Sequence, residues 1–232
     1  SRKFINRLKG IESESSGFEP VNDNMRASNG GAMKIGPVAC FGKGDMEKTI
    51  DIAKVICMPT HGNRISMSAA CAVAAAVCGA LNGKDLFGIF KDAMSGAEKG
   101  EAIGAAGNTV AGPSFPKRLR FAIELGMNAK DLSEAMDVLR SYFDCSGMAA
   151  DSVPVSFGLM AAAKGDVMAA VQAAANIGND TDTMATIVGA VLGAKNGVHA
   201  FPEELVRKLD EANGYDLCAL AETMEATDVV IG

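Results

Sequence analysis

The feature that most constrains the fold is the uncharged stretch at residues 65–83, which is rich in Ala, Ser, Cys and Gly. Its length invites comparison with a membrane span, but Ala contributes little transfer free energy, so a buried core helix is the better interpretation. Aromatic residues make up only 5% of the sequence, and long β-branched alternations are absent. These features predict an all-α fold of about ten helices.

Length and charge narrow the class of protein further. A chain of 232 residues suffices for one domain with a full core, and no long linker or internal repeat is visible, so we expect a single domain over residues 1–232. The net charge of −6 argues against nucleic acid as a partner, and the core helix argues against a membrane. Six cysteines without a Cys-x-x-Cys pair indicate free thiols and a cytoplasmic location. The sequence does not indicate an oligomeric state.

A polar turn at Gly178 and Asn179 precedes a helical pattern of apolar residues. Both turn residues have easy access to unusual backbone dihedral angles. Asp180 suits the N-cap, because its carboxylate can accept hydrogen bonds from the free amides of the first turn. We expect the other helices to pack around this one. Gly189 and Gly193 lie four residues apart, so a neighbouring helix could approach closely there.

Asp180, Asp182 and Thr183 place two carboxylates and a hydroxyl within four residues. Acidic residues in a first turn commonly cap the helix and complement its dipole. Hard divalent cations also prefer such oxygen atoms, and Mg²⁺ usually takes one or two carboxylates together with water. Asp180 and Thr183 are three residues apart and can face the same way. On these residues alone, a capping role and a metal-binding role both remain open.

The stretch Ile-Gly-Asn-Asp-Thr-Asp-Thr-Met-Ala-Thr-Ile, residues 177–187, resembles the carboxy-terminal signature of the ADP-ribosylglycohydrolase family. This family includes the dinitrogenase reductase-activating glycohydrolases. The sequence departs from the usual pattern at Asn179, where the family has a second glycine. The resemblance implies that Asp180, Asp182 and Thr183 bind metal and that the two aspartates are catalytic. It implies a centre of two Mg²⁺ ions, with Mn²⁺ as the alternative.

A second segment, Asn29-Gly-Gly-Ala-Met-Lys34, resembles the family's Gly-Asn-Gly-Ala-Ala-Met-Arg motif, with Lys34 in place of the usual arginine. By itself, a turn of small residues is most often only a turn. The resemblance implies that this turn contacts ADP-ribose. The ligand-binding residues it implies are Ser28, Asn29, Gly30 and Gly31.

His61 follows a helix that we expect over residues 45–58 and that Pro59 should end, which places His61 in a loop. A histidine in a loop is most often a surface residue that forms hydrogen bonds. The family has a Thr-His pair here, which implies that His61 lies near the ribose and phosphates of the ligand. The other histidine, His199, has no such support. A later helix is expected over residues 154–164, beginning at a proline.

The resemblance extends over nearly all of this chain. A full family member is longer, and this chain corresponds to roughly its last two thirds. The family's other metal ligands come from an earlier Thr-Asp-Asp segment, and this sequence contains no Asp-Asp pair. We therefore expect either part of a longer protein or a shortened and inactive one. The implied function is metal-dependent hydrolysis of the glycosidic bond in an ADP-ribosylated protein or an ADP-ribosyl small molecule. The alternative is a non-catalytic ADP-ribose-binding protein or a structural, crystallin-like family member.

Overall fold

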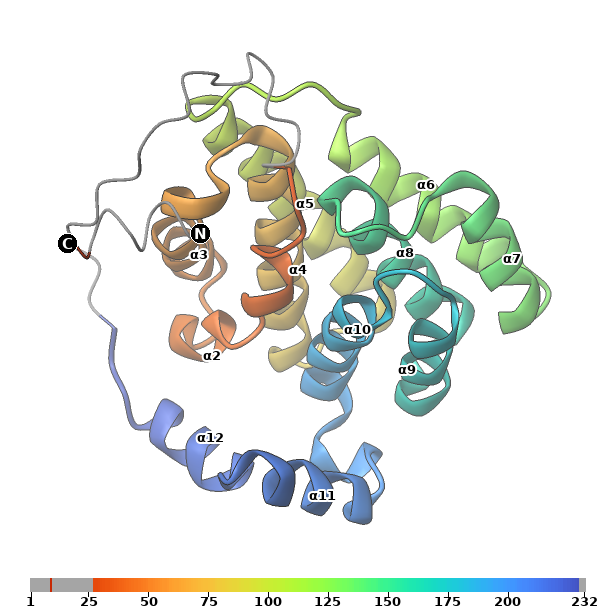
Figure 1. Cartoon of the computed structure of the whole chain (residues 1–232). Helices are drawn as coiled ribbons and strands as arrows, with labels where there is room; N and C mark the ends of the chain where they lie inside the picture. Colours follow the sequence, from red (N-terminus) through yellow and green to blue (C-terminus); the bar gives the residue numbers. More distant parts are fainter. Residues whose placement is uncertain (1–8, 10–26, 230–232) are drawn as a thin grey trace.

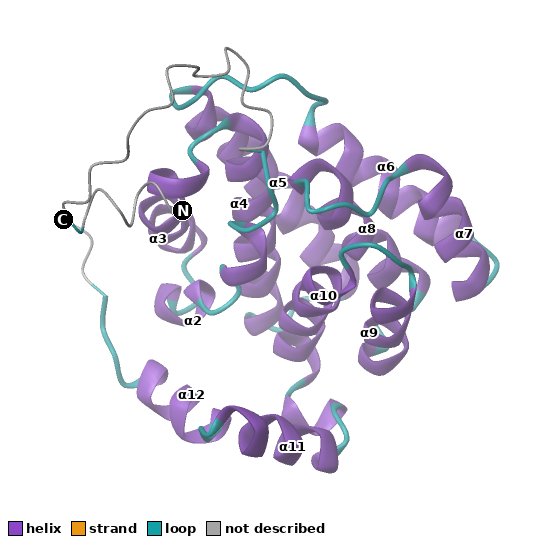
Figure 2. Cartoon of the chain, in the orientation of Figure 1, coloured by secondary structure: helices purple, strands orange, loops and turns teal. Residues whose placement is uncertain are grey.

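The computed structural model describes Lys9 and residues 27–229, and within them the protein is all-α (Figure 2). Its only extended pairings in that part are two isolated bridges, Ser28 with Met148 and Asn63 with Asn108. The prediction of an all-α fold of about ten helices is confirmed, and the described residues form eleven α-helices. In chain order, the α-helices and two 3₁₀ helices are η2 (Ala32–Lys34), α2 (Val38–Gly42), α3 (Met46–His61), α4 (Arg64–Leu81), α5 (Leu86–Ala105), α6 (Phe115–Asn128), α7 (Leu132–Tyr142), α8 (Ala149–Ala162), α9 (Val167–Asn176), α10 (Thr181–Asn196), η3 (Val198–Ala200), α11 (Glu203–Asn213) and α12 (Leu217–Glu225).

Helix α4 lies at the centre of the molecule, with α3, α5, α8 and α10 packed around it (Figure 1). By length and composition α4 could cross a membrane, but 89% of its residues are buried inside the protein, as expected for a core helix. The prediction that the helices pack around α10 is wrong. Helix α4 is apolar on every side, whereas α10 carries exposed positions such as Asp182 and Thr186 and so can be covered only in part.

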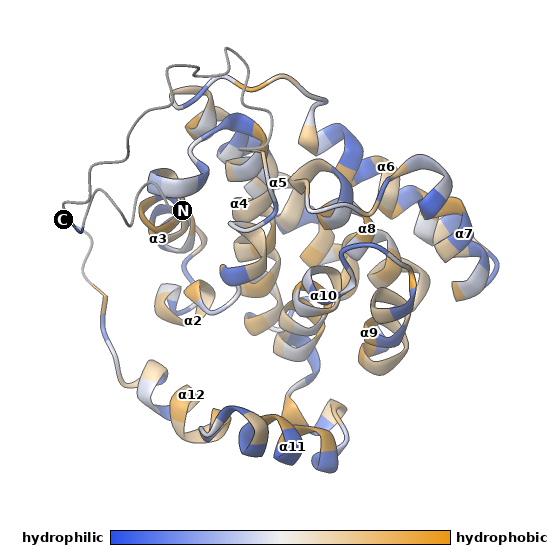
Figure 3. Ribbon diagram, in the orientation of Figure 1, coloured by the Kyte–Doolittle hydropathy of each residue, from blue (hydrophilic) through white to orange (hydrophobic). Residues whose placement is uncertain are grey.

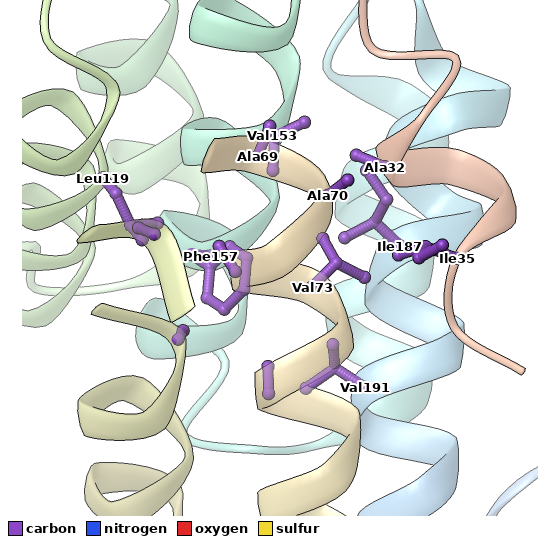
Figure 4. Packing of buried hydrophobic residues seen from close by; sticks show 14 of the residues in the cluster. Ala32, Ile35, Ala69, Ala70, Val73, Leu119, Val153, Phe157, Ile187 and Val191 are labelled. Atoms are coloured by element: carbon purple, nitrogen blue, oxygen red, sulfur yellow. The ribbon is translucent and has the colours of Figure 1, made fainter. Parts of the chain in front are cut away.

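The core is built from small side chains of α4 and larger ones of its neighbours (Figure 4). Ala70 and Val73 of α4 lie near Ile187 of α10, and Phe157 of α8 packs on the other side. Each of these four side chains is at most 1% exposed. The alanine-rich composition of α4 therefore allows several helices to share one centre.

Helices α4 and α5 approach closely along a seam of glycines, which we define as Gly96, Gly100 and Gly104. A Cβ atom built at any of them would lie less than 3 Å from a backbone carbonyl oxygen of α4 or of its N-cap residue Asn63. Real Cβ atoms essentially never come so close. The seam therefore fixes the separation of the two helices.

The close helix contact expected at Gly189 and Gly193 is absent from the part of the chain that the structure describes. Nothing lies within 4 Å of a Cβ atom built at Gly189, and Gly193 faces the ring of Phe201. Spacing of four residues shows that two glycines share a helix face, but it does not show which face another helix covers.

Two prolines lie inside helices that they were expected to delimit. Helix α3 includes Pro59 and ends two residues later, at His61. The missing N–H of Pro59 costs the helix one backbone hydrogen bond and does not end it. Helix α8 begins at Ala149 and includes Pro154. Pro154 cannot donate to the carbonyl oxygen of Ala150 four residues earlier, and Nε of Arg118 donates to that oxygen at 2.6 Å. A tertiary contact thus replaces the missing helical bond.

Helices α11 and α12 lie along one side of the bundle and contain no buried residue (Figure 3). Their apolar positions Leu205, Leu209, Leu217 and Leu220 are all exposed. The candidate site described next involves neither helix.

Candidate active site

Residues 28–31 meet three segments that lie far away in the sequence. These are the end of α3 at His61, the start of α8 at Ser152 and the start of α10 at Asp180. We call residues 28–31 the ligand segment and residues 180–183 the metal segment, after their predicted roles. The two segments are therefore neighbours in the fold.

A short antiparallel bridge holds the ligand segment in place. Ser28 pairs with Met148, and the amide of Asn29 donates to the carbonyl oxygen of Gly147 at 2.9 Å. The carbonyl oxygen of Ser28 accepts from Oγ of Ser66 on α4 at 2.9 Å. The segment is thus attached to both α4 and the loop before α8.

The turn before α10 adopts the unusual dihedral angles that its residues predicted. Gly178 has φ of 103° and Asn179 has φ of 60°. Nδ2 of Asn179 donates to the carbonyl oxygen of Asp144 at 2.9 Å, and the amide of Asp180 donates to that of Cys145 at 3.0 Å. These bonds fix where α10 begins.

Asp180 occupies the N-cap position of α10, but its side chain forms no capping hydrogen bond. Its ψ of 60° lies outside the extended region in which N-cap side chains reach the first-turn amides. Oδ2 of Asp180 instead accepts from Nδ2 of Asn29 at 2.5 Å. The expectation that this carboxylate caps the helix is therefore wrong, because a contact with Asn29 takes its place.

Asn29 is 5% exposed, and its Nδ2 also donates to Oγ of Ser152 at 2.8 Å. An ionised carboxylate can only accept hydrogen bonds, so the amide nitrogen must be the atom that faces Asp180. Both N–H groups of the amide are then used, and its carbonyl oxygen is directed elsewhere. The sequence analysis did not identify Ser152, because nothing in the neighbouring sequence distinguishes it from other serines.

Thr183 is buried, and its Oγ1 lies 3.8 Å from Sδ of Met33. Asp180 and Thr183 thus both face the segment at residues 28–34, as their spacing of three suggested. Asp182 is exposed at the start of α10. The three predicted metal ligands are therefore close in sequence but differ in burial.

His61 is 7% exposed, and its ring lies against the backbone of Gly30 and Gly31. A Cβ atom at Gly30 would lie 2.8 Å from Nε2 of the imidazole, so a larger residue would displace the ring. Nδ1 lies 2.7 Å from Oγ1 of Thr60. Burial, and then the positive charge of Lys34, lower the pKa of His61 to about 4. The imidazole is therefore neutral at pH 7.

A pocket of about 230 Å³ lies next to the short bridge, where Ala27 and Met148 line it together with Ile65. Its polar walls are Arg118 and Asp151, which form an ion pair of 2.9 Å. Ala27 of this pocket directly precedes residues 28–31 in the sequence.

The donor atoms at the start of α10 suit a hard cation, because they are two carboxylates and a hydroxyl. Among the residues that the structure describes, no three His, Cys, Asp or Glu side chains lie close enough together to hold a metal ion. Asp180, Asp182 and Thr183 alone supply too few ligands for the two-ion centre that the resemblance implies.

Comparison with known proteins gives one family. A family model described as ADP-ribosylglycohydrolase matches residues 1–230. The uncharacterized protein YegU of Escherichia coli (strain K12) is 28% identical over 195 residues, which are 84% of this chain and 58% of that protein. The chain thus spans less than two thirds of the length of the curated relative that it matches.

Proposed function

Because the chain belongs to the ADP-ribosylglycohydrolase family, we propose that the protein hydrolyses a glycosidic bond at the anomeric carbon of ADP-ribose. The substrate would be an ADP-ribosylated protein or a related ADP-ribosyl or ribosyl compound. The observation that carries this proposal is the direction of the Asp180 carboxylate. It forms no cap for its own helix and lies against Asn29 of the ligand segment.

The proposed roles are those that the family resemblance implies for these side chains. Asp180, Asp182 and Thr183 would hold Mg²⁺ or Mn²⁺ together with ligands from elsewhere in the protein. When bound, the metal would orient the ribose hydroxyls and activate the attacking water. His61 is neutral at pH 7 and can donate or accept one hydrogen bond through Nε2. Lys34 adds a positive charge that suits the diphosphate.

A second candidate is ADP-ribose binding without catalysis. The incomplete ligand set among the described residues favours it, because two carboxylates and a hydroxyl are too few for two ions. Both candidates use the same ligand segment, so they differ in turnover and not in binding.

Binding is tested by calorimetry of the 232-residue chain with ADP-ribose. Changing Asn29 or His61 to alanine should weaken affinity by at least about fivefold, the effect of one ordinary hydrogen bond. The control variant His199→Ala changes the only other histidine, which is exposed and belongs to η3, and should bind as the wild type does. Unchanged affinity in both Asn29→Ala and His61→Ala would reject the ligand site.

Turnover is tested in a polypeptide that spans the full length of the family. Asp182→Ala should abolish metal-dependent hydrolysis while the protein stays folded. If Asp182 only complements the helix dipole, its loss should cost about 0.3–1 kcal/mol of stability and leave turnover nearly intact. In the 232-residue chain we expect weak metal binding and no turnover. Tight ADP-ribose binding with no hydrolysis in the longer polypeptide would favour the non-catalytic candidate.

A further inference from the structure

Ser152 is a fully buried serine in the second turn of α8. Its Oγ accepts from Nδ2 of Asn29 at 2.8 Å and donates to the carbonyl oxygen of Met148 at 3.3 Å. The amide of Asn29 is thereby fixed at two points, by Ser152 on one N–H group and by Asp180 on the other. One plane of the amide satisfies both bonds, so rotation of this amide would break at least one of them.

We propose that Ser152 is a positioning residue that fixes the direction of the Asp180 carboxylate through the side-chain amide of Asn29. This inference rests on the proposed function, in which the Asp180 carboxylate binds metal and its direction therefore matters. The first-turn amides of α10 receive no side-chain cap and offer the carboxylate a competing set of donors. When Asn29 is held by Ser152, its N–H group stays aimed at Asp180, and the carboxylate remains turned away from its own helix.

Ser156 provides a matched control. It lies one turn further along α8, is equally buried, and donates to the carbonyl oxygen of Ser152 at 2.9 Å. Both serines therefore form a hydrogen bond to the carbonyl four residues earlier, but only Ser152 contacts Asn29. A comparison of Ser152→Ala with Ser156→Ala separates loss of the Asn29 contact from loss of a buried hydroxyl.

The first measurement is NMR spectroscopy of the isotope-labelled 232-residue chain without metal. In Ser152→Ala, hydrogen exchange of one Asn29 side-chain proton should accelerate by at least about fivefold, as expected for loss of an ordinary hydrogen bond. The backbone amide proton of Thr183, which is the third residue of α10, should shift downfield as the Asp180 carboxylate turns to cap the helix. Ser156→Ala should show neither change, and Ser152→Thr, which keeps the hydroxyl, should behave as the wild type does.

The same signals decide against the proposal if Ser152→Ala and Ser156→Ala give the same Asn29 and Thr183 spectra. Melting temperatures establish that both variants are folded. If Ser152→Ala does not fold, Ser152→Cys preserves the volume with a weaker acceptor and should show the same two changes in smaller degree. Unaltered spectra in a folded Ser152→Cys would overturn the proposal equally.

The second measurement is titration with Mn²⁺ alone, followed by paramagnetic broadening at the start of α10. Ser152→Ala should weaken Mn²⁺ binding by about fivefold, and Ser156→Ala should change it by less than about twofold. Equal affinities in both variants would contradict a positioning role. If wild-type protein shows no Mn²⁺ broadening at all, the metal part of the proposed function fails, whereas the metal-free spectra still decide the role of Ser152.

Discussion

Acidification should destabilise the fold through His61, and the size of the effect follows from its burial. The pKa of His61 is lowered to about 4 in the folded protein, against an ordinary value of 6.5 in the unfolded chain. As the pH falls below the unfolded value, the unfolded chain takes up a proton that the folded protein refuses. Each pH unit then removes about 1.4 kcal/mol. Between about pH 6.5 and pH 4.5 the loss from this one group should be about 2–3 kcal/mol.

Urea unfolding at several pH values between about 7 and 4.5 measures this contribution. Other groups also titrate in that range, so the informative quantity is the difference between wild type and His61→Gln. The variant lacks the buried imidazole, so its free energy of unfolding should fall by about 2–3 kcal/mol less than that of the wild type between about pH 6.5 and pH 4.5. His199→Gln changes the exposed histidine and should follow the wild-type curve. Parallel curves for wild type and His61→Gln would refute the argument that burial keeps His61 neutral.

A double-mutant cycle of Asn29→Ala with Asp180→Ala, followed by urea unfolding, should give a coupling free energy of about 1.5–3 kcal/mol, the range for a hydrogen bond to a charged group. Coupling below about 0.3 kcal/mol would show that the two side chains do not interact. Gly126→Ala should destabilise the protein by about 1–3 kcal/mol or more, because its Cβ atom would collide with the backbone carbonyl of Gly158 where α6 crosses α8. Gly189→Ala fills open space on a helix and should raise stability by about 0.5–1 kcal/mol, so similar melting temperatures for these two variants would contradict the packing described.

Much of the fold could be predicted because its strongest signals are local. The uncharged stretch at residues 65–83 predicted a buried helix, and α4 spans Arg64–Leu81. Its apolar composition on all sides is a property of the segment itself, and so are the turn dihedrals at Gly178 and Asn179. The sequence did not show that α4, and not α10, is the centre, because centrality depends on which faces the other helices cover.

The errors arose where a distant contact overrides a local rule. Proline normally delimits a helix, but Arg118 compensates for the bond that Pro154 removes in α8. Aspartate at an N-cap normally bonds its own helix, but Asn29, 151 residues away in sequence, takes the carboxylate of Asp180. Spatial proximity of the ligand segment and the metal segment was implied by the family resemblance alone. Ser152 carried no local signal, because its importance lies entirely in the partner that it meets.

The glycine seam between α4 and α5 has a consequence for any saturation mutagenesis of this protein. Gly104 backs directly onto Asn63, which lies two residues from His61, so an added side chain there would collide with the backbone that joins α3 to α4. Substitutions at this position should therefore destabilise the connection between α3 and α4, and so disturb the support of His61. A map of destabilising variants will consequently include a stripe along α5 spaced by four residues, and these positions report how closely α4 and α5 must pack.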